Sequence, residues 1–417
     1  MQRTLIPLSP TQALGFCLAI ALFECLTYMA SDMVMPAMSA VTRELQADTR
    51  HVPYAFHLYL IGGACLQWLI GPLSDRFGRR LALLTGCALF GAACAAALAA
   101  PSIEAFNALR FLQGIGLGFV VAVSYPALQE VFREADAVRL MALLGNVALL
   151  SPLLGPLLGS LLLEWVSWRG LFLGLGIAAA VAWIGLWLSM PETIGVRRHD
   201  GARQSPVPFC WRRTCRRYLA LLLNRRFLGA CLALGLMTLP LMAWIGLAPL
   251  LLIHVSGLST REYALWQIPV FSAVIGGNLI LDRLLATREL PAVIRLSLWP
   301  FCLGLLILAG AALTSPTVAG LIGGLSVYAL GLGMSNAALY RLALYSSDDS
   351  KGLVSAAVGM ISIGVMGGGG TLIAAIGGGT RLEAFALWAA LGGFLSLPLL
   401  HAFLRGTADD RTSTATP

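Results

Sequence analysis

Three residues near the start of the chain place reactive side chains in an apolar stretch: Glu24, Tyr28 and Asp32, within 21–38. They follow one another at intervals of four residues, so in a helix they fall along one face. An ionisable side chain at membrane depth costs about 2.5–3.5 kcal/mol on insertion scales. We therefore expect this face to point into a helix bundle or a wet cavity, where its carboxylates could exchange protons and meet a substrate.

The composition indicates that these residues belong to a polytopic, all-α membrane protein. Of 417 residues, 58% are hydrophobic and 12% are charged, about half the charged fraction of a soluble chain. Runs of about 20 apolar residues each fit one helical crossing, because lipid cannot satisfy backbone N–H and C=O groups. We predict twelve spans, near 11–38, 49–70, 80–99, 103–128, 138–163, 168–190, 224–254, 262–284, 291–312, 316–345, 352–377 and 382–404.

Arginines gather in the loops on one side of the predicted spans, which the positive-inside rule makes cytoplasmic. Both termini are then expected in the cytoplasm, and the first span is expected to be retained as an anchor. The net charge of +8 follows from this topology, so no nucleic-acid partner is needed to explain it.

A basic loop at 192–223 divides the chain into two six-helix bundles, 1–191 and 224–405, followed by a polar tail, 406–417, for which we expect disorder. The bundles echo each other at 71–80 and 278–288, as in transporters built from repeats. Residues 211–226 alternate basic and apolar side chains. This pattern fits an amphipathic helix on the inner leaflet and, equally, a solvated basic connector.

Several kinds of site are not indicated. The nine cysteines are scattered, and none falls in a predicted outer loop, so we expect no disulfide. The five histidines lack metal-ligand spacing, and no phosphate-binding loop is present. The glycines at 114, 116 and 118 are typical of helix packing. With no nucleophile and base arrangement either, we expect neither an enzyme nor a metal or cofactor site.

Three motifs carry a resemblance to a known family. Residues 71–80, GPLSDRFGRR, match the loop signature G-x-x-x-D-R-x-G-R-R; 109–114, LRFLQG, place an Arg inside a span; and 155–159, GPLLG, give a Gly/Pro pattern associated with antiporters. The chain resembles the major facilitator superfamily, in its twelve-span drug:proton antiporter branch. The acidic pair Glu24 and Asp32 also matches a multidrug member, which has Asn where this chain has Ser31.

The resemblance implies a proton-coupled multidrug exporter of the bacterial inner membrane that works by alternating access. It implies lipophilic cations and neutral, chloramphenicol-like antibiotics as substrates, protons as the coupled ion, and no cofactor. We expect a monomer in the lipid bilayer.

Proton coupling is expected at Glu24, Asp32 and Arg110. Because the first span runs outward and the fourth runs inward, Asp32 and Arg110 should lie at similar depth, and a buried Arg needs acceptors. The alternative is that Arg110 is a static strut, bonded in part through Gln113. Burial favours the neutral form of Glu24, which would let it take up a proton; a permanently neutral core Glu is the alternative.

The substrate surface should be apolar and adaptable, because Met and aromatic side chains repack around varied ligands. Ordinary helix packing is the alternative for each of its residues. The candidates are Tyr28, Ser31, Asp32, Met141, Leu144, Asn146, Met237, Leu239, Met242 and Phe271.

Two further groups are expected to serve the conformational cycle. The loop signature should act as a latch whose charges pair with helix ends in one state, unless it is only a topological charge cluster. The prolines and glycine of the fifth span should kink it or allow helices to approach closely. The latch residues are Gly71, Asp75, Arg76, Gly78, Arg79 and Arg80, and the kink residues are Pro152, Gly155 and Pro156.

Two rival functions stay open. A proton-coupled symporter or exporter of one narrow substrate class could use the same fold. A membrane sensor or enzyme could use the bundle as a scaffold, although no extramembrane domain supports it.

Overall fold

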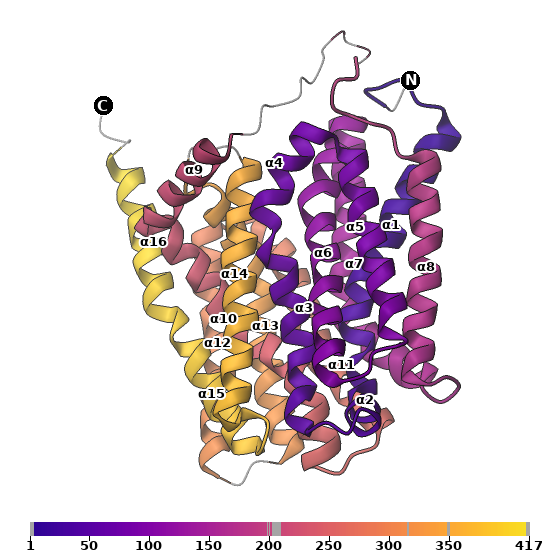
Figure 1. The fold of residues 1–417 in the computed structure, drawn as a ribbon. Helices are drawn as coiled ribbons and strands as arrows, with labels where there is room; N and C mark the ends of the chain where they lie inside the picture. The colour runs from indigo at the N-terminus through magenta and orange to yellow at the C-terminus, as the bar shows by residue number, and fades with distance from the viewer. Residues whose placement is uncertain are drawn as a thin grey trace. The chain divides into compact units, whose positions relative to one another are not determined.

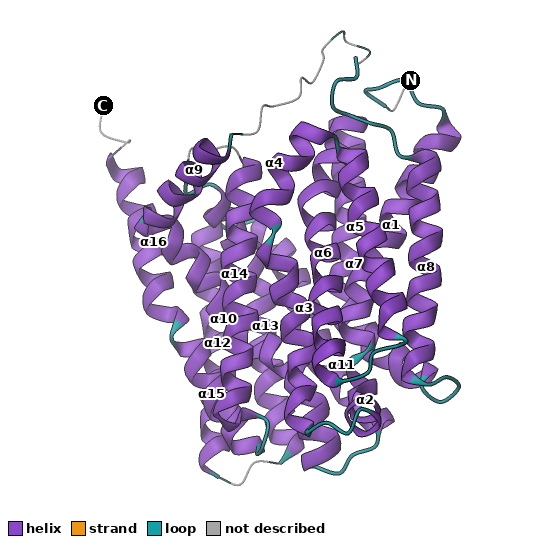
Figure 2. Ribbon diagram, viewed as in Figure 1, coloured by secondary structure: helices purple, strands orange, loops and turns teal. Residues whose placement is uncertain are grey.

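The computed structural model describes residues 4–197, 199, 201, 210–314, 317–347 and 351–413. Of these, the side chains of 134, 135, 138, 139, 142, 145, 146, 149, 351, 352 and 406–413 are outside the description. Over the described part of the chain the regular structure is helical and no strand forms (Figure 2). The all-α class expected from composition is thus confirmed.

The chain separates into two units, Met1–His51 with Leu58–Thr214 (unit 1) and Val52–His57 with Cys215–Pro417 (unit 2). The boundary at 214/215 lies in the basic segment expected to divide the chain, and the first turn of α3 groups with unit 2. The early helices (Figure 1) are α1 (Pro10–Met33), α2 (Met38–Glu44), α3 (Val52–Cys65), α4 (Gln67–Phe77), α5 (Arg79–Ala97), α6 (Ile103–Val131), α7 (Glu134–Leu162) and α8 (Trp168–Ser189).

The later helices follow a short amphipathic helix, α9 (Trp211–Leu223). They are α10 (Arg225–Pro249), α11 (Thr260–Leu285), α12 (Leu290–Leu313), α13 (Val318–Leu344), α14 (Lys351–Ile373), α15 (Leu382–Phe394) and α16 (Ser396–Ser413). Single 3₁₀ turns lie at Met35–Ala37 and Thr49–His51, and π-helical turns end α10 at Leu250–Val255 and α14 at Ala374–Gly378.

The two units repeat one pattern of helix packing. In unit 1, α1 packs on α7, α5 packs on α6 and α8, and α4 packs on α6. In unit 2, α10 packs on α14, α12 packs on α13 and α15, and α11 packs on α13. Each helix pair of unit 1 therefore has an equivalent pair in unit 2: α1 corresponds to α10, and α4 to α8 correspond to α11 to α15. This equivalence confirms the predicted pseudo-repeat.

The predicted spans all find a helical counterpart. Ten helical segments of the described chain are long and apolar enough to cross a membrane, and α3 with α4, bent by 44°, forms an eleventh. The remaining predicted span, 138–163, corresponds to α7, which contains a shorter apolar stretch at Leu150–Leu162.

Helix starts follow ordinary capping chemistry. A side-chain oxygen at the N-cap accepts a backbone N–H of the first turn, which satisfies a donor that has no partner within the helix. At α11 the Ser259 and Glu262 side chains form a reciprocal capping box. The other caps of this kind are Ser9, Ser102, Ser167, Asn224 and Thr317.

The structure describes two segments outside the bundles, the basic segment at 211–226 and the start of the tail at 406. The segment at 211–226 forms helix α9 over Trp211–Leu223, with Tyr218 and Leu221 buried and Leu219 and Leu223 exposed. The tail expected to be disordered from residue 406 instead continues α16 as far as Ser413, because extending an existing helix costs far less than starting one. Residues 414–417 lie outside the described part.

Candidate functional site

Asp32 lies near the end of α1 and is 3% exposed. The Ser151 hydroxyl on α7 donates to its Oδ2 atom at 2.7 Å, and the adjacent Ser31 hydroxyl lies within hydrogen-bonding reach of the same carboxyl. A buried carboxyl needs such partners, because an unsatisfied polar group in the interior is costly. Asp32 is thus held inside unit 1 by hydroxyl groups.

Glycines on α7 allow α1 to come this close. A Cβ on Gly155 would lie 2.6 Å from the Asp32 Cβ, and one on Gly159 would lie 2.2 Å from the Met33 carbonyl oxygen. Gly155 and Gly159 stand four and eight residues after Ser151, so all three share one face of α7. The small residues therefore place the Ser151 hydroxyl against the carboxylate, as small residues do at membrane helix contacts.

The fifth span was expected to be kinked or to allow helices to approach closely. α7 continues as one helix from Glu134 to Leu162, with Pro152 and Pro156 inside it. Of the two alternatives, the close helix approach is the one for which Gly155 gives direct evidence.

Arg110 on α6 is 0% exposed. Its Nη1 donates to Gln113 Oε1 at 2.7 Å, and its Nη2 donates to the Ser31 carbonyl oxygen at 3.5 Å. The guanidinium lies 4.6 Å from the centre of the Tyr59 ring and interacts electrostatically with Asp32. The structure therefore places Arg110 against the carbonyl of Ser31, the residue that precedes Asp32.

Glycines also set the contact between α3 and α6 that positions Arg110. A Cβ on Gly114 would lie 2.0 Å from the Tyr59 carbonyl oxygen, and one on Gly62 would lie 2.1 Å from the Phe111 carbonyl oxygen. Tyr59, itself buried, donates its hydroxyl to the Thr27 carbonyl of α1. The packing role expected for this glycine run is confirmed, and it holds a tyrosine between α1 and the buried guanidinium.

Glu24 lies two turns before Asp32 and is 1% exposed. The Tyr125 hydroxyl of α6 donates to its Oε1 atom at 3.1 Å, while its buried Oε2 atom has no hydrogen-bond partner among the described residues. Both acidic residues of α1 therefore face the interior of unit 1. Neither acid faces outward toward lipid, a position that would contradict a proton-exchange role.

The substrate candidates of unit 1 lie along α1 and α7. Tyr28 and Met141 are half-buried, Leu144 is buried, and Met141 accepts a 3.5 Å contact from Gln129. Ser31 is buried and donates its hydroxyl to the Tyr28 carbonyl at 2.7 Å. The side chain of Asn146 lies outside the described residues.

The other candidates lie in unit 2 and include residues with packing contacts. Leu239 on α10 meets Gly369 and Gly392, whose added Cβ atoms would lie 2.8 and 3.1 Å from its methyl groups. Met237 and Phe271 are buried, and the Met237 carbonyl accepts the Tyr328 hydroxyl. Met242 is half-buried. These contacts give Leu239 a role in helix packing, the alternative considered for each candidate.

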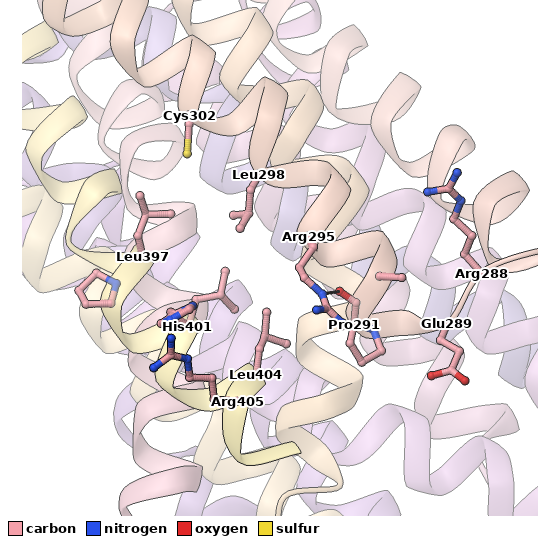
Figure 3. A pocket seen from close by; sticks show the side chains of 13 residues that line it. Arg288, Glu289, Pro291, Arg295, Leu298, Cys302, Leu397, His401, Leu404 and Arg405 are labelled. Atoms are coloured by element: carbon pink, nitrogen blue, oxygen red, sulfur yellow. Dashed lines mark hydrogen bonds between the residues drawn. The ribbon is translucent and has the colours of Figure 1, made fainter. Parts of the chain in front are cut away.

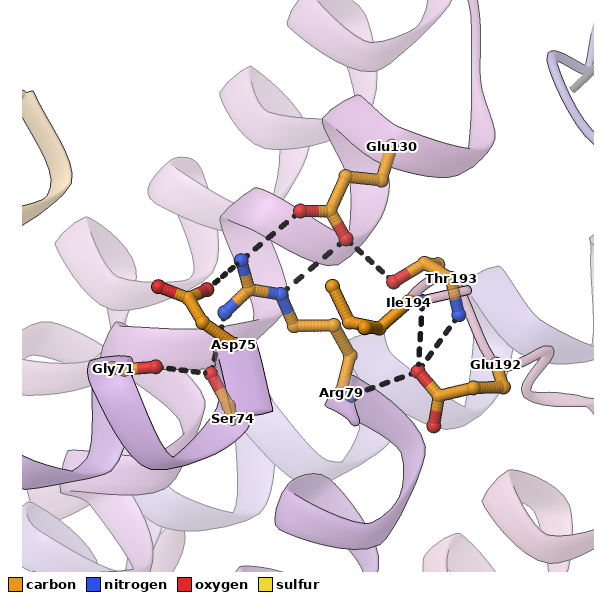
Figure 4. Close-up of polar contacts among 8 residues, drawn as sticks. All are labelled: Gly71, Ser74, Asp75, Arg79, Glu130, Glu192, Thr193 and Ile194. Atoms are coloured by element: carbon orange, nitrogen blue, oxygen red, sulfur yellow. Dashed lines mark hydrogen bonds and ion pairs between the residues drawn. The ribbon is translucent and has the colours of Figure 1, made fainter. Parts of the chain in front are cut away.

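Three of the expected latch residues, Gly71, Asp75 and Arg79, belong to one polar network around Arg79 (Figure 4). This side chain makes ion pairs with Asp75 and with Glu130 Oε1, the latter at 3.0 Å, and it also donates to Ser74. Ser74 in turn donates to the Gly71 carbonyl at 2.7 Å. The network joins α4 and α5 to the end of α6.

Glu192, just after α8, closes the network from the other side. Its carboxylate accepts the backbone N–H groups of Arg79 at 3.0 Å and Arg80 at 3.3 Å, at the start of α5. Two arginines at a helix N-terminus oppose the helix dipole, and a carboxylate there offsets them. Gly78 has φ +106°, and a Cβ there would meet Glu192 Oε2 at 2.2 Å, so this position requires glycine.

Arg76 and Arg80 are less central to the network. Arg76 lies 5.1 Å from the Phe77 ring centre, and Arg80 stacks on Trp187 at 5.6 Å while donating to its carbonyl at 2.6 Å. Arg80 thus ties the start of α5 to the end of α8.

The partners that sequence analysis missed are Tyr125, Ser151, Glu130 and Glu192. Glu130 lies in the last turn of α6, just beyond the span predicted at 103–128, and Thr193 donates to it at 2.5 Å. Ser151 stands one turn before Gly155, so its place on the small-residue face was a usable signal. Nothing in the spacing identified Tyr125.

The comparisons with known proteins agree with this architecture. The D-xylose-proton symporter superposes with a TM-score of 0.72 at 14% identity, over 93% of this chain and 97% of that one. A bacterial homologue of the lysosomal transporter Spinster, in an inward-facing and unoccupied conformation, gives a TM-score of 0.70 at 12% identity, over 97% and 99%. At such identities the likeness establishes the fold alone.

Sequence comparison goes further. The chain is 45% identical to multidrug transporter MdfA of Yersinia pestis bv. Antiqua (strain Angola), over 94% of this chain and 95% of that protein. It is 43% identical to multidrug transporter MdfA of Escherichia coli O157:H7, over 94% of each. The family model described as Major Facilitator Superfamily matches residues 20–371. The chain therefore belongs to the major facilitator superfamily and is a membrane transporter rather than an enzyme.

Proposed function

We propose that this chain is a proton-coupled multidrug exporter in which Glu24 and Asp32 carry the protons. One observation supports the proposal above all: both buried carboxyls of α1 are bonded to hydroxyl groups, Tyr125 for Glu24 and Ser151 for Asp32. Family membership and the name of the relatives supply the transport context.

A hydroxyl partner suits a carboxyl that must change its charge. Hydroxyl groups both donate and accept, so Ser151 can donate to ionised Asp32 and accept from its protonated form. A guanidinium only donates and would hold its partner in the ionised state. Arg110, bonded to Gln113 and the Ser31 carbonyl, acts on Asp32 through its charge. We assign Arg110 the role of lowering the cost of ionised Asp32 when the proton leaves.

Transport then follows as a competition between proton and drug. Drug binding in the inward-facing state promotes deprotonation of a carboxyl, and proton entry from outside releases the drug. Each pH unit supplies about 1.4 kcal/mol per proton, and each charge moved supplies about 2.3 kcal/mol per 100 mV. Export of a neutral drug for one proton uses both terms, whereas export of a monovalent cation uses the pH term alone.

The substrates that fit this scheme are lipophilic cations and neutral, chloramphenicol-like antibiotics. A deprotonated carboxylate attracts a cation, and the candidates Tyr28 and Met141 of unit 1 and Met242 of unit 2 have side chains that can repack around varied ligands. The relatives are named multidrug transporters, which supports a broad range. Ser31, shorter than an amide, is expected to shift that range.

The network around Arg79 is proposed as the conformational latch. Its ion pairs with Asp75 and Glu130 hold α4, α5 and α6 together in this conformation, and the transport cycle would separate them. We place the protein in the bacterial inner membrane as a monomer, with both termini in the cytoplasm, because the loop arginines favour that side.

The test is drug-induced proton release from purified protein, together with drug uptake into liposomes under an imposed pH gradient. Asp32→Asn should abolish proton-coupled transport of all drugs. Glu24→Gln should impair export of a cation such as tetraphenylphosphonium more than export of chloramphenicol, because a neutral drug does not need that negative charge. Glu164→Gln, which neutralises an exposed acid, should leave both activities intact.

Four outcomes would count against this proposal or a part of it. Equal loss of both drug classes in Glu24→Gln would refute the division of roles between the acids. Transport of one compound class only would favour a narrow-range transporter, and drug accumulation in cells that carry the protein would favour uptake. Failure of the intact protein to move any solute under a pH gradient would favour a sensor.

A further inference from the structure

Unit 2 contains a cavity of about 830 Å³ between α12 and α16 (Figure 3). Three arginines line it, Arg288, Arg295 and Arg405, with His401 and a single carboxylate, Glu289. Three arginines against one glutamate leave a net charge of +2 when His401 is neutral. This charge disfavours the cationic drugs proposed as substrates and favours an anionic ligand.

Two arginines of the cavity, Arg295 and Arg405, retain N–H groups that can bind a ligand. Among the described residues, neither Arg295 nor Arg405 has a carboxylate within 4.0 Å, and Arg295 Nε donates to the Pro291 carbonyl at 3.3 Å. Both residues are exposed. Their remaining N–H groups can donate to an anion such as a phosphate.

The rest of the cavity is apolar. Leu298 and Cys302 follow Arg295 by three and seven residues on one face of α12, and Leu397 precedes His401 by one turn on α16. Figure 3 shows Arg295, His401 and Arg405 toward one end of the space, with Leu298, Leu397 and Cys302 farther along the two helices. The cavity thus has a basic end that continues into an apolar groove.

The surrounding surface favours one source for such a ligand. Trp299, Leu303 and Leu306 on α12 are 78%, 54% and 59% exposed, as expected for a helix that faces lipid. A free anion would use the basic end alone and leave the apolar groove empty. A ligand that fills both parts has a phosphate at one end and hydrocarbon at the other.

We propose that this cavity binds an anionic phospholipid, with its phosphate on Arg295, Arg405 and His401 and its acyl chains along Leu298 and Cys302. Basic pockets between membrane helices on the cytoplasmic side suit such headgroups. This end of unit 2 follows an arginine-bearing loop that the positive-inside rule assigns to the cytoplasm. None of the proton-coupling residues is among those that line the cavity, so the site does not depend on the proposed transport function.

Lipid binding is tested on the full-length protein in detergent by native mass spectrometry after delipidation, with added cardiolipin, phosphatidylglycerol or phosphatidylcholine. Wild-type protein should retain the anionic lipids. The double variant Arg295→Gln/Arg405→Gln should bind them at least about tenfold more weakly, because it loses two charge-assisted donors. The matched control Arg225→Gln/Arg283→Gln removes the same charge from exposed residues outside the cavity and should bind as wild type does.

A second readout uses the cysteine of the apolar groove. Anionic phospholipid should slow maleimide labelling of half-buried Cys302 and leave labelling of exposed Cys210 unchanged, as resolved by peptide mass mapping. This measurement needs no substitution, so it stands even if the double variant misfolds.

Four results would overturn the proposal. Equal loss of lipid in the control variant would show general charge attraction. Equal retention of phosphatidylcholine would show an apolar groove without headgroup selection. Protection of Cys302 by inorganic phosphate alone would show a free-anion site, and unchanged labelling of Cys302 with anionic lipid would show that the groove is empty.

Discussion

Replacing Gly155 with alanine should separate the acidic end of α1 from its hydroxyl partner. The added Cβ would lie 2.6 Å from the Asp32 Cβ and 3.2 Å from the Met33 backbone nitrogen. Carbon atoms normally approach to about 3.5–4.0 Å, so α7 must retreat by about 1 Å. Backbone atoms cannot rotate away, which makes the clash costly.

This retreat has a calculable effect on Asp32. Ser151 stands one turn before Gly155, so the same shift would lengthen its bond to Asp32 from 2.7 Å to about 3.6 Å, beyond hydrogen-bonding range. Overpacking of this kind costs about 1–3 kcal/mol. We expect a lower midpoint of thermal unfolding and weaker drug-induced proton release, measured on the same purified samples.

Two variants make the comparison interpretable. Gly174→Ala on α8 adds the same methyl group where nothing lies within 4 Å, so it should leave proton release unchanged and should not lower the unfolding midpoint, because alanine favours a helix more than glycine does. Ser151→Ala removes the hydroxyl without the clash and should reproduce the loss of proton release with a smaller loss of stability. If Gly155→Ala matched Gly174→Ala in both measurements, the contact between α1 and α7 would not position Asp32.

Two further variants test other contacts. Glu130→Gln should lower thermal stability by about 1.5–3 kcal/mol, because it removes a charged acceptor of buried Arg79; a midpoint equal to wild type would show that this ion pair does not stabilise the conformation. Gly370→Ala should also lower the unfolding midpoint, because its Cβ would lie 2.4 Å from Nε2 of buried His57 within unit 2; His57→Ala should relieve the added cost, and strictly additive effects would contradict the clash.

The spans and the burial of both acids of α1 follow from the sequence because each depends on a single helix. A carboxylate in an apolar span must be buried in protein, whichever neighbour it meets. Predicting the burial of Glu24 and Asp32 therefore needed no knowledge of the neighbouring helices. The match to the loop signature at 71–80 likewise depends on local sequence alone.

The partners of these residues could not be predicted in the same way. Which side chain meets Asp32 depends on how α7 is rotated about its axis, and Ser151 is one of several polar residues that could have reached it. Arg110 is near Asp32 as expected, but its bonds go to Gln113 and the Ser31 carbonyl. Leu239 had an apolar character suited to a binding surface or to packing, and its contact with Gly369 could not be read from the sequence.

Unit 1 contains two kinds of buried acidic residue, and their hydrogen-bond partners suit them to different roles. Glu130 is bonded to the Arg79 guanidinium through two nitrogens, a partner that donates only and therefore favours a permanent negative charge. Glu24 and Asp32 have hydroxyl partners, which are satisfied by either protonation state. The acid near α4 and α5 is thus suited to holding helices together, and the acids of α1 are suited to losing and regaining a proton. The same carboxyl chemistry would suit the proposed latch in one place and the proposed proton carrier in the other, because the adjacent donor decides whether its charge can change.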